Sequence, residues 1–184
     1  MGVHRSAAQV KLICGLIAGS DAWLEQGSER LGEAFGPMDL RSDVFPFDAT
    51  DYYVREMGEG LRRQFVAFAR LLDPGELAGI KRRTNAMETE WVQGDPGAKR
   101  RRVNLDPGYV TPAKLVLATT KDFAHRIYLG EGIYAEVTLN FRKGGFRHFE
   151  WTYLDFVSGR YEAFLLAVRR RLMEQTAGDG HPPD

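Results

Sequence analysis

The chain has 184 residues, of which 43% are hydrophobic and 27% charged, a composition typical of a globular protein with a sizeable core. Its 25 basic and 25 acidic residues leave no formal net charge, so global charge gives no argument for nucleic acid or a membrane surface as partner. One cysteine, no membrane-length apolar stretch and no signal-peptide pattern lead us to expect a cytoplasmic protein with no membrane partner.

The first elements in the chain are a strand and a helix. The apolar segment 11–19 is short and ends in Gly-Ser, which is typical of a central strand covered on both faces. A helix follows, capped by Ser20 or Asp21 and ended by Gly36-Pro37. Residues 39–47 predict a second strand.

A third strand and a second helix come next. Residues 61–72 have the apolar density of a strand, although their spacing also fits an amphipathic helix. Asp73 then supplies a helix cap, with Pro74 at the first helical position and Glu76 at the third. We expect this helix to bury Leu77, Ile80, Thr84, Met87 and Trp91. Arg101 to Leu105 predicts a further strand, ended by Pro107-Gly108.

The last third predicts a short helix at 111–120, a hairpin, a strand at 146–150 and a helix beginning at Ser158. With a three-residue loop at 130–132, the hairpin places Arg126 opposite Glu136 on one side. Its other side then carries the residues expected to face the core: Ile127, Leu129, Ile133, Ala135, Val137 and Leu139.

These elements predict one α+β domain at residues 10–175, with flexible termini at 1–9 and 176–184. The first elements have the ferredoxin-like order β-α-β-β-α-β, and the short helix, a β-meander and the C-terminal helix are added to this unit.

Common catalytic signatures are absent from the sequence. It has no phosphate-binding loop of the Walker type, no G-x-S-x-G elbow, no H-E-x-x-H and no cysteine-histidine zinc spacing. A Walker-type nucleotide site, common hydrolases and structural zinc therefore have no support.

Polar residues instead gather in five short stretches, at 50–53, 82–85, 100–109, 119–126 and Glu136. If the third stretch alternates as a strand, Arg102, Asn104 and Asp106 share one face, which is costly to bury unless they are paired or bound. Three of the stretches also have an ordinary interpretation: packed tyrosines at 50–53, a solvated helix face at 82–85 and a plain Arg126–Glu136 pair.

Several long motifs resemble a known family. They are Phe-Pro-Phe at 45–47, Thr-Asp-Tyr-Tyr at 50–53, Arg-Thr-Asn at 83–85, and the stretches 104–109, 114–122, 125–129 and 133–139. From Lys11 to about Arg171 the chain resembles a bacterial family of domains of unknown function. The resemblance implies no activity. Some members carry an automatic GTP-binding label, but this sequence has no phosphate-binding loop to support it. The resemblance does coincide with the five polar stretches, which favours one shared site.

We hypothesise a pocket for a small anionic ligand, phosphorylated or nucleotide-like, in which basic groups neutralise phosphate and amides or tyrosines orient the remainder. The candidate ligand-binding residues are Tyr52, Arg83, Asn85, Arg102, Asn104, Tyr109, Lys121, Arg126 and Glu136. Candidate acids, bases or metal ligands are Asp106, His125 and Asp51, and the carboxylates of the two aspartates would suit Mg²⁺. Hydrolysis or transfer of a phosphoryl group is the corresponding reaction.

The alternative is an RNA-binding or protein-binding module without catalytic activity. Residues 65–68 match the end of the RNA-recognition aromatic strand motif. However, Arg63 and Leu12 occupy positions where stacking aromatics are expected, which favours core packing of Phe65 and Phe68. Exposed aromatics on a sheet face would support the module, and a concave polar pocket would support the small ligand.

Overall fold

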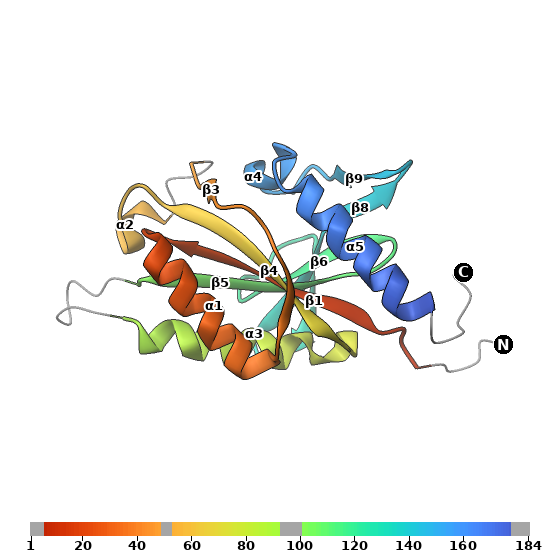
Figure 1. Cartoon of the computed structure of the whole chain (residues 1–184), viewed down its shortest axis with the longest axis horizontal. Coiled ribbons are helices and arrows are strands. Elements are labelled where there is room, and N and C mark those ends of the chain that lie inside the picture. The colour runs from red at the N-terminus through yellow and green to blue at the C-terminus, as the bar shows by residue number, and fades with distance from the viewer. Residues whose placement is uncertain (1–5, 49–52, 93–100, 178–184) are drawn as a thin grey trace.

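The structure is a computed structural model that describes residues 6–48, 53–92 and 101–177, without the side chains of residues 54 and 55 (Figure 1). Its strands are β1 (Val10–Ala18), β2 (Met38–Arg41), β3 (Phe45–Pro46), β4 (Arg62–Leu72), β5 (Val103–Val110), β6 (Lys114–Thr119), β7 (Arg126–Gly130), β8 (Ile133–Arg142) and β9 (Gly145–His148). Its helices are α1 (Asp21–Phe35), α2 (Val54–Met57), the 3₁₀ turn η1 (Pro74–Glu76), α3 (Leu77–Glu90), α4 (Leu154–Val157) and α5 (Glu162–Ala177).

Within this described part of the chain, nine strands form one sheet in the order β2-β4-β1-β5-β6-β8-β7, with β3 against β4 and β9 against β8. The α+β class is confirmed. The central position predicted for the first strand is also confirmed, because β1 is buried along its whole length and pairs antiparallel with β4 on one side and β5 on the other.

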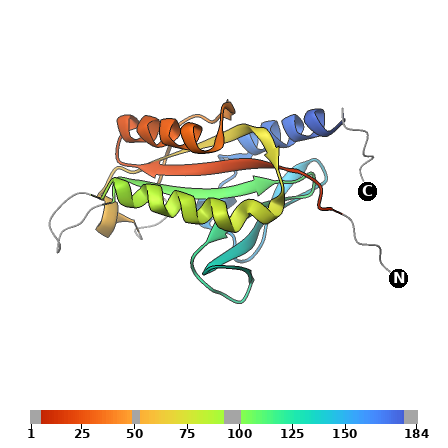
Figure 2. The ribbon, with the colours of Figure 1, turned by 90° about the horizontal axis from the view of Figure 1, so that it is seen from below.

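Helices cover both faces of this sheet (Figures 1 and 2). Leu12, Cys14 and Leu16 of β1 belong to a core cluster with residues of α1 and α3. Ile13 and Phe65 belong to a second cluster, on the face covered by α5. The alternation of an extended strand thus sends successive side chains into two cores.

The signals predicted for α1 and for the start of α3 are confirmed. Ser20 accepts a hydrogen bond from the Trp23 amide at the start of α1, and Gly36 ends that helix at a φ of 96°, which a glycine adopts without strain. Asp73 and Glu76 form a reciprocal capping box ahead of α3. The buried residues of α3 are Leu77, Ile80, Lys81, Thr84, Met87 and Glu88. Trp91, which we also expected on this face, is the C-cap of the helix and is partly buried.

The C-terminal helix begins at Glu162 and not at Ser158, which is the C-cap of α4, but its expected core face is confirmed. Its buried residues are Phe164, Leu165, Val168 and Leu172, and Tyr161 is buried just before the helix begins. Residues 176 and 177, which we expected to belong to a flexible terminus, belong to α5. The single-turn helix α4 was not predicted.

Three sequence predictions between residues 39 and 120 are wrong. The segment 111–120 contains a strand, β6, because its apolar residues pair with β5 and β8, while Pro112 occupies the turn before it. β5 continues through Pro107-Gly108, which we expected to end it. Gly108 suits this position because a Cβ there would lie 2.3 Å from the Val116 carbonyl oxygen. The expected strand 39–47 is divided into β2 and β3.

The hairpin register is largely confirmed, but its orientation is only partly so. Arg126 pairs with Glu136 and Tyr128 with Tyr134, whereas Gly130, not Leu129, lies opposite Ile133. The loop therefore has two residues, 131 and 132, and not the three that we expected. Ile127 and Leu129 are 67% and 41% exposed on β7, the last strand in the order of the sheet. These two side chains were wrongly assigned to the core.

The aromatic residues of the RNA-recognition-like motif are core residues. Phe65 and Phe68 are buried, and Phe65 packs against Phe156, Tyr161 and Phe164. No helix in the described residues is long and apolar enough to cross a membrane.

Candidate functional site

The sheet opens between β5 and β6. These strands pair at three positions, Gly108–Val110 with Leu115–Leu117. Beyond them lies a cavity of about 860 Å³, here called the β5/β6 cavity. It is lined by Phe47, Tyr53, Glu56, Arg63, Lys81, Asn85, Glu88, Thr89, Arg101, Asn104, Asp106, residues 117–121, Arg126, Glu136 and residues 150–156.

Side chains of α3 occupy the edge of β5 where a neighbouring strand would pair. Lys81 donates to the Leu105 carbonyl oxygen at 2.7 Å, and the Leu105 amide donates to Glu88 Oε1 at 2.7 Å. Buried backbone groups need such partners. By satisfying them from the helix, α3 allows β6 to diverge and the β5/β6 cavity to exist.

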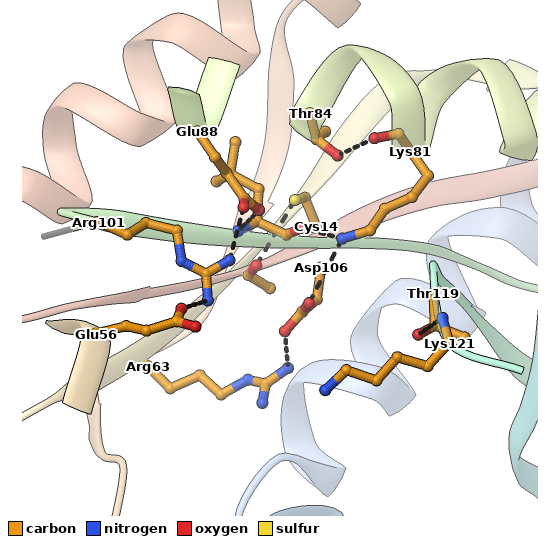
Figure 3. A network of polar contacts seen from close by, with 12 residues as sticks. Cys14, Glu56, Arg63, Lys81, Thr84, Glu88, Arg101, Asp106, Thr119 and Lys121 are labelled. Carbon is orange, nitrogen blue, oxygen red and sulfur yellow. Dashed lines mark hydrogen bonds and ion pairs between the residues drawn. The ribbon is translucent and has the colours of Figure 1, made fainter. Parts of the chain in front are cut away.

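A chain of ion pairs connects several of the side chains that line the cavity (Figure 3). Arg63 lies 2.7 Å from Asp155 and 3.4 Å from Asp106, and Lys81 lies 3.8 Å from the other oxygen of Asp106. Burial acts to lower the pKa of the Arg63 guanidinium, but Asp155 and Asp106 outweigh burial and the pKa is raised. Arg63 therefore stays charged and connects α4 to β5.

The chain of contacts continues on the α3 side of the cavity. Arg101 lies 2.8 Å from Glu88 and 3.0 Å from Glu56, and its guanidinium faces the Tyr53 ring at 5.6 Å. Burial raises the pKa of Glu88, although Lys81 and Arg101 act against it. Burial also raises the pKa of the Tyr53 hydroxyl, so this phenol stays protonated.

The raised pKa of Glu88 predicts a pH dependence. A carboxyl group with a folded pKa above its unfolded value binds more protons when folded, so it favours folding at low pH and this contribution is lost as pH rises. We expect Glu88→Gln, which keeps an acceptor for the Leu105 amide, to gain stability relative to the parent chain as pH increases from about 4.5 to 7. Urea unfolding across this range measures it, with Glu29→Gln on α1 as an exposed control. A Glu88→Gln difference that does not change with pH would contradict the assignment.

Glu136 forms a second cluster on the β6–β8 side. Its Oε2 atom lies 2.9 Å from both His125 Nε2 and Arg126 Nε, and its Oε1 accepts a hydrogen bond from Thr138. The His125 ring stacks on Trp151, with centroids 5.0 Å apart. Glu136 is thus a buried carboxylate held by two basic side chains, one of which, Arg126, lines the cavity.

A β-bulge in β8 shapes this side of the cavity. Leu115 pairs with Leu139 and Val116 with Val137, which leaves Thr138 as the extra residue. The carbonyl oxygens of Val137 and Thr138 accept hydrogen bonds from the side chains of Trp151 and Thr152. The bulge therefore brings the segment around Trp151 to the cavity.

The predicted site residues divide into three groups. Those that line the β5/β6 cavity are Asn85, Asn104, Asp106, Lys121, Arg126 and Glu136, and His125 contacts Glu136. Three do not line it: Arg83, Arg102 and Tyr109. Arg83 packs on the Phe35 ring, and Tyr109 packs against the core. Asp51 and Tyr52 lie outside the described residues.

Several important cavity residues were missed by the sequence reasoning: Arg63, Lys81, Glu88, Arg101 and Asp155. A signal for two of them exists, since Arg63 interrupts the apolar strand 61–72 and Lys81 follows Ile80 on the expected buried helix. A charge at a core position that the pattern predicts as buried points to a paired, specific role.

The described residues contain no group of three or more histidine, cysteine, aspartate or glutamate side chains placed to hold a metal ion. Asp106 instead lies beside Arg63 and Lys81.

Comparison with known proteins then places the chain in a family. The model of a domain of unknown function, DUF4416, matches residues 8–172. The chain belongs to this family. No curated protein and no solved structure matches the sequence. The matched range of this DUF4416 chain contains every described residue of the cavity.

Proposed function

We propose that the β5/β6 cavity binds a small ligand that carries an oxyanion, either phosphate or carboxylate. The observation that carries this proposal is a pair of buried donors. Asn104 Nδ2 and Arg63 Nε belong to cavity-lining residues that are each 4% exposed, and neither atom has a hydrogen-bond partner among the described residues. An unsatisfied buried donor costs about 1–3 kcal/mol, and an acceptor oxygen of a ligand would remove this cost.

The surrounding residues support a small-molecule site. A cavity of about 860 Å³ is of the size that small ligands occupy. Lys121 extends from the end of β6 toward Asp106 and Arg63 (Figure 3), where it would meet an oxyanion held by Asn104. Phe47, Tyr53 and other aromatic residues of the wall suit a flat group such as a base, so a nucleotide-like ligand belongs to the proposal.

A reaction at the bound oxyanion extends the proposal. Asp106 is the carboxylate that lines the cavity next to Asn104 on β5, and His125 is oriented by Glu136 as a proton-transfer group needs to be. Hydrolysis or transfer of a phosphoryl group is the reaction class that we assign to these residues.

We also propose that the N-terminal half is a ferredoxin-like unit. The strand order β2-β4-β1-β5, with α1 and α3 packed against one face, supports this proposal. Such a unit would place the cavity at its β5 edge, where the remaining strands are added.

The proposal is tested by removing the Asn104 donor. A charge-assisted hydrogen bond contributes about 1.5–3 kcal/mol, so Asn104→Leu should weaken ligand binding by roughly 10- to 100-fold. The unliganded variant should be as stable as the parent, because the unsatisfied amide is removed with its cost. Calorimetric titration with inorganic phosphate, phosphomonoesters and simple carboxylates measures the effect.

Gln26→Leu, which removes an exposed amide on α1 that does not line the cavity, is the matched control. Absence of binding by the parent chain across this panel would disprove the proposal. Equal binding by parent and Asn104→Leu would remove Asn104 from the site.

A further inference from the structure

The charged side chains that line the β5/β6 cavity are nearly balanced. The basic residues are Arg63, Lys81, Arg101, Lys121 and Arg126, and the acidic residues are Glu56, Glu88, Asp106, Glu136, Glu150 and Asp155. A site built for several phosphate groups concentrates positive charge, usually with backbone amides or a metal ion. This lining has one more acid than base.

Four of the basic residues are already paired with carboxylates of the same lining. Arg63 lies 2.7 Å from Asp155, Arg101 2.8 Å from Glu88 and Arg126 2.9 Å from Glu136. Lys81 lies 3.8 Å from Asp106. Each pair cancels much of the positive potential that its cation would otherwise present to a ligand. One oxyanion would be stabilised by hydrogen bonds from Asn104 and Arg63. Additional negative charges on the same ligand would be repelled by the carboxylates of the lining.

The orientation of α3 adds to this balance. Its cavity-lining residues include Glu88 and Thr89 in the last turn of the helix, not residues of its first turn. The C-terminal end of a helix carries a partial negative charge. The helix therefore adds unfavourable potential for each extra negative charge of a ligand.

We infer that the site selects a ligand with a single small oxyanion and rejects diphosphates and triphosphates. The inference rests on the proposed function and narrows its ligand class to a monophosphate ester or a monocarboxylate. Two observations together support this inference. The cavity has a pair of buried donors, on Asn104 and Arg63, and the charged residues that line it form ion pairs and carry a slightly negative total charge.

The test is a charge series at constant ionic strength, without added divalent ions. Inorganic phosphate, pyrophosphate and tripolyphosphate are titrated into the parent chain by calorimetry. We expect pyrophosphate to bind at least tenfold more weakly than phosphate, and tripolyphosphate more weakly again. Affinity that rises along the series would overturn the inference and leave the proposed oxyanion site standing. Failure of all three anions and of the carboxylates would overturn both.

A charge variant separates charge from size. Glu150 is an exposed lining residue, so Glu150→Gln should leave the fold unchanged and strengthen pyrophosphate binding more than phosphate binding. Glu29→Gln makes the same charge change on α1, away from the lining, and should change neither affinity. An unchanged phosphate-to-pyrophosphate ratio in Glu150→Gln would show that size, not charge, rejects the larger anion, and would overturn the inference.

Discussion

Replacing Arg63 with methionine should lower the free energy of unfolding by about 3–5 kcal/mol, the cost of breaking a buried ion pair on one side. Asp155 has a side chain that is 5% exposed, and Arg63 is its ion-pair partner at 2.7 Å. Without the guanidinium, this carboxylate keeps a weak hydrogen bond from the Tyr161 hydroxyl at 3.3 Å. Urea unfolding at neutral pH measures the loss.

Two variants show whether the loss comes from the stranded charge. Adding Asp155→Asn to Arg63→Met removes the uncompensated carboxylate and should recover part of the lost stability. Arg62 occupies the neighbouring position of β4 and forms an exposed ion pair with Asp21 of α1. Arg62→Ala breaks this pair and should lower the free energy of unfolding by at most about 1 kcal/mol. An Arg63→Met loss below about 1 kcal/mol would contradict the buried network.

Replacing Ile80 with alanine should cost about 2–5 kcal/mol, the range for truncating a large aliphatic side chain in a core. Ile80 is 6% exposed and belongs to the cluster that joins α3 to β1 and β5. The same helix holds Lys81 and Glu88 against the backbone of β5, so loosening it should also weaken oxyanion binding at the β5/β6 cavity. Denaturant unfolding and phosphate titration measure the two effects.

Arg82→Ala is the matched control on α3. Arg82 is exposed and its partner Glu131 is exposed, so the change should alter stability by at most about 1 kcal/mol and leave binding unaffected. Equal losses for Ile80→Ala and Arg82→Ala would show that Ile80 does not lie in a packed core.

The elements that sequence reasoning located correctly are those with strong local signals. β1 is apolar except for Lys11 and is followed by Gly19 and Ser20, and α1 and α3 have caps and helical spacing. Such signals depend on residues within a few positions of one another, so they survive in any fold that buries the apolar side. The prediction for the segment 111–120 was wrong because its local proline signal favours a helix, whereas the strand β6 is stabilised by pairing with β5 and β8.

Part of the candidate site could also be predicted from local sequence signals. Asn104 and Asp106 share one face of β5 because side chains alternate along a strand, and both line the cavity as the alternation predicts. Lys121 follows β6 directly, so its place near the cavity also depends on local chain direction. Arg102 does not line the cavity, although the same alternation placed it with them, because β5 begins at Val103.

The sequence by itself therefore determined the class of fold, the main helices and the alternation that carries Asn104 and Asp106. Tertiary structure alone decided that β5 and β6 diverge, because this depends on Lys81 and Glu88 reaching Leu105 from 24 and 17 positions away. It likewise decided the pairing of Arg63 with Asp155, which are separated by 92 positions. Buried charges are stable only beside partners, and those partners are brought together by the folded chain rather than by neighbouring residues.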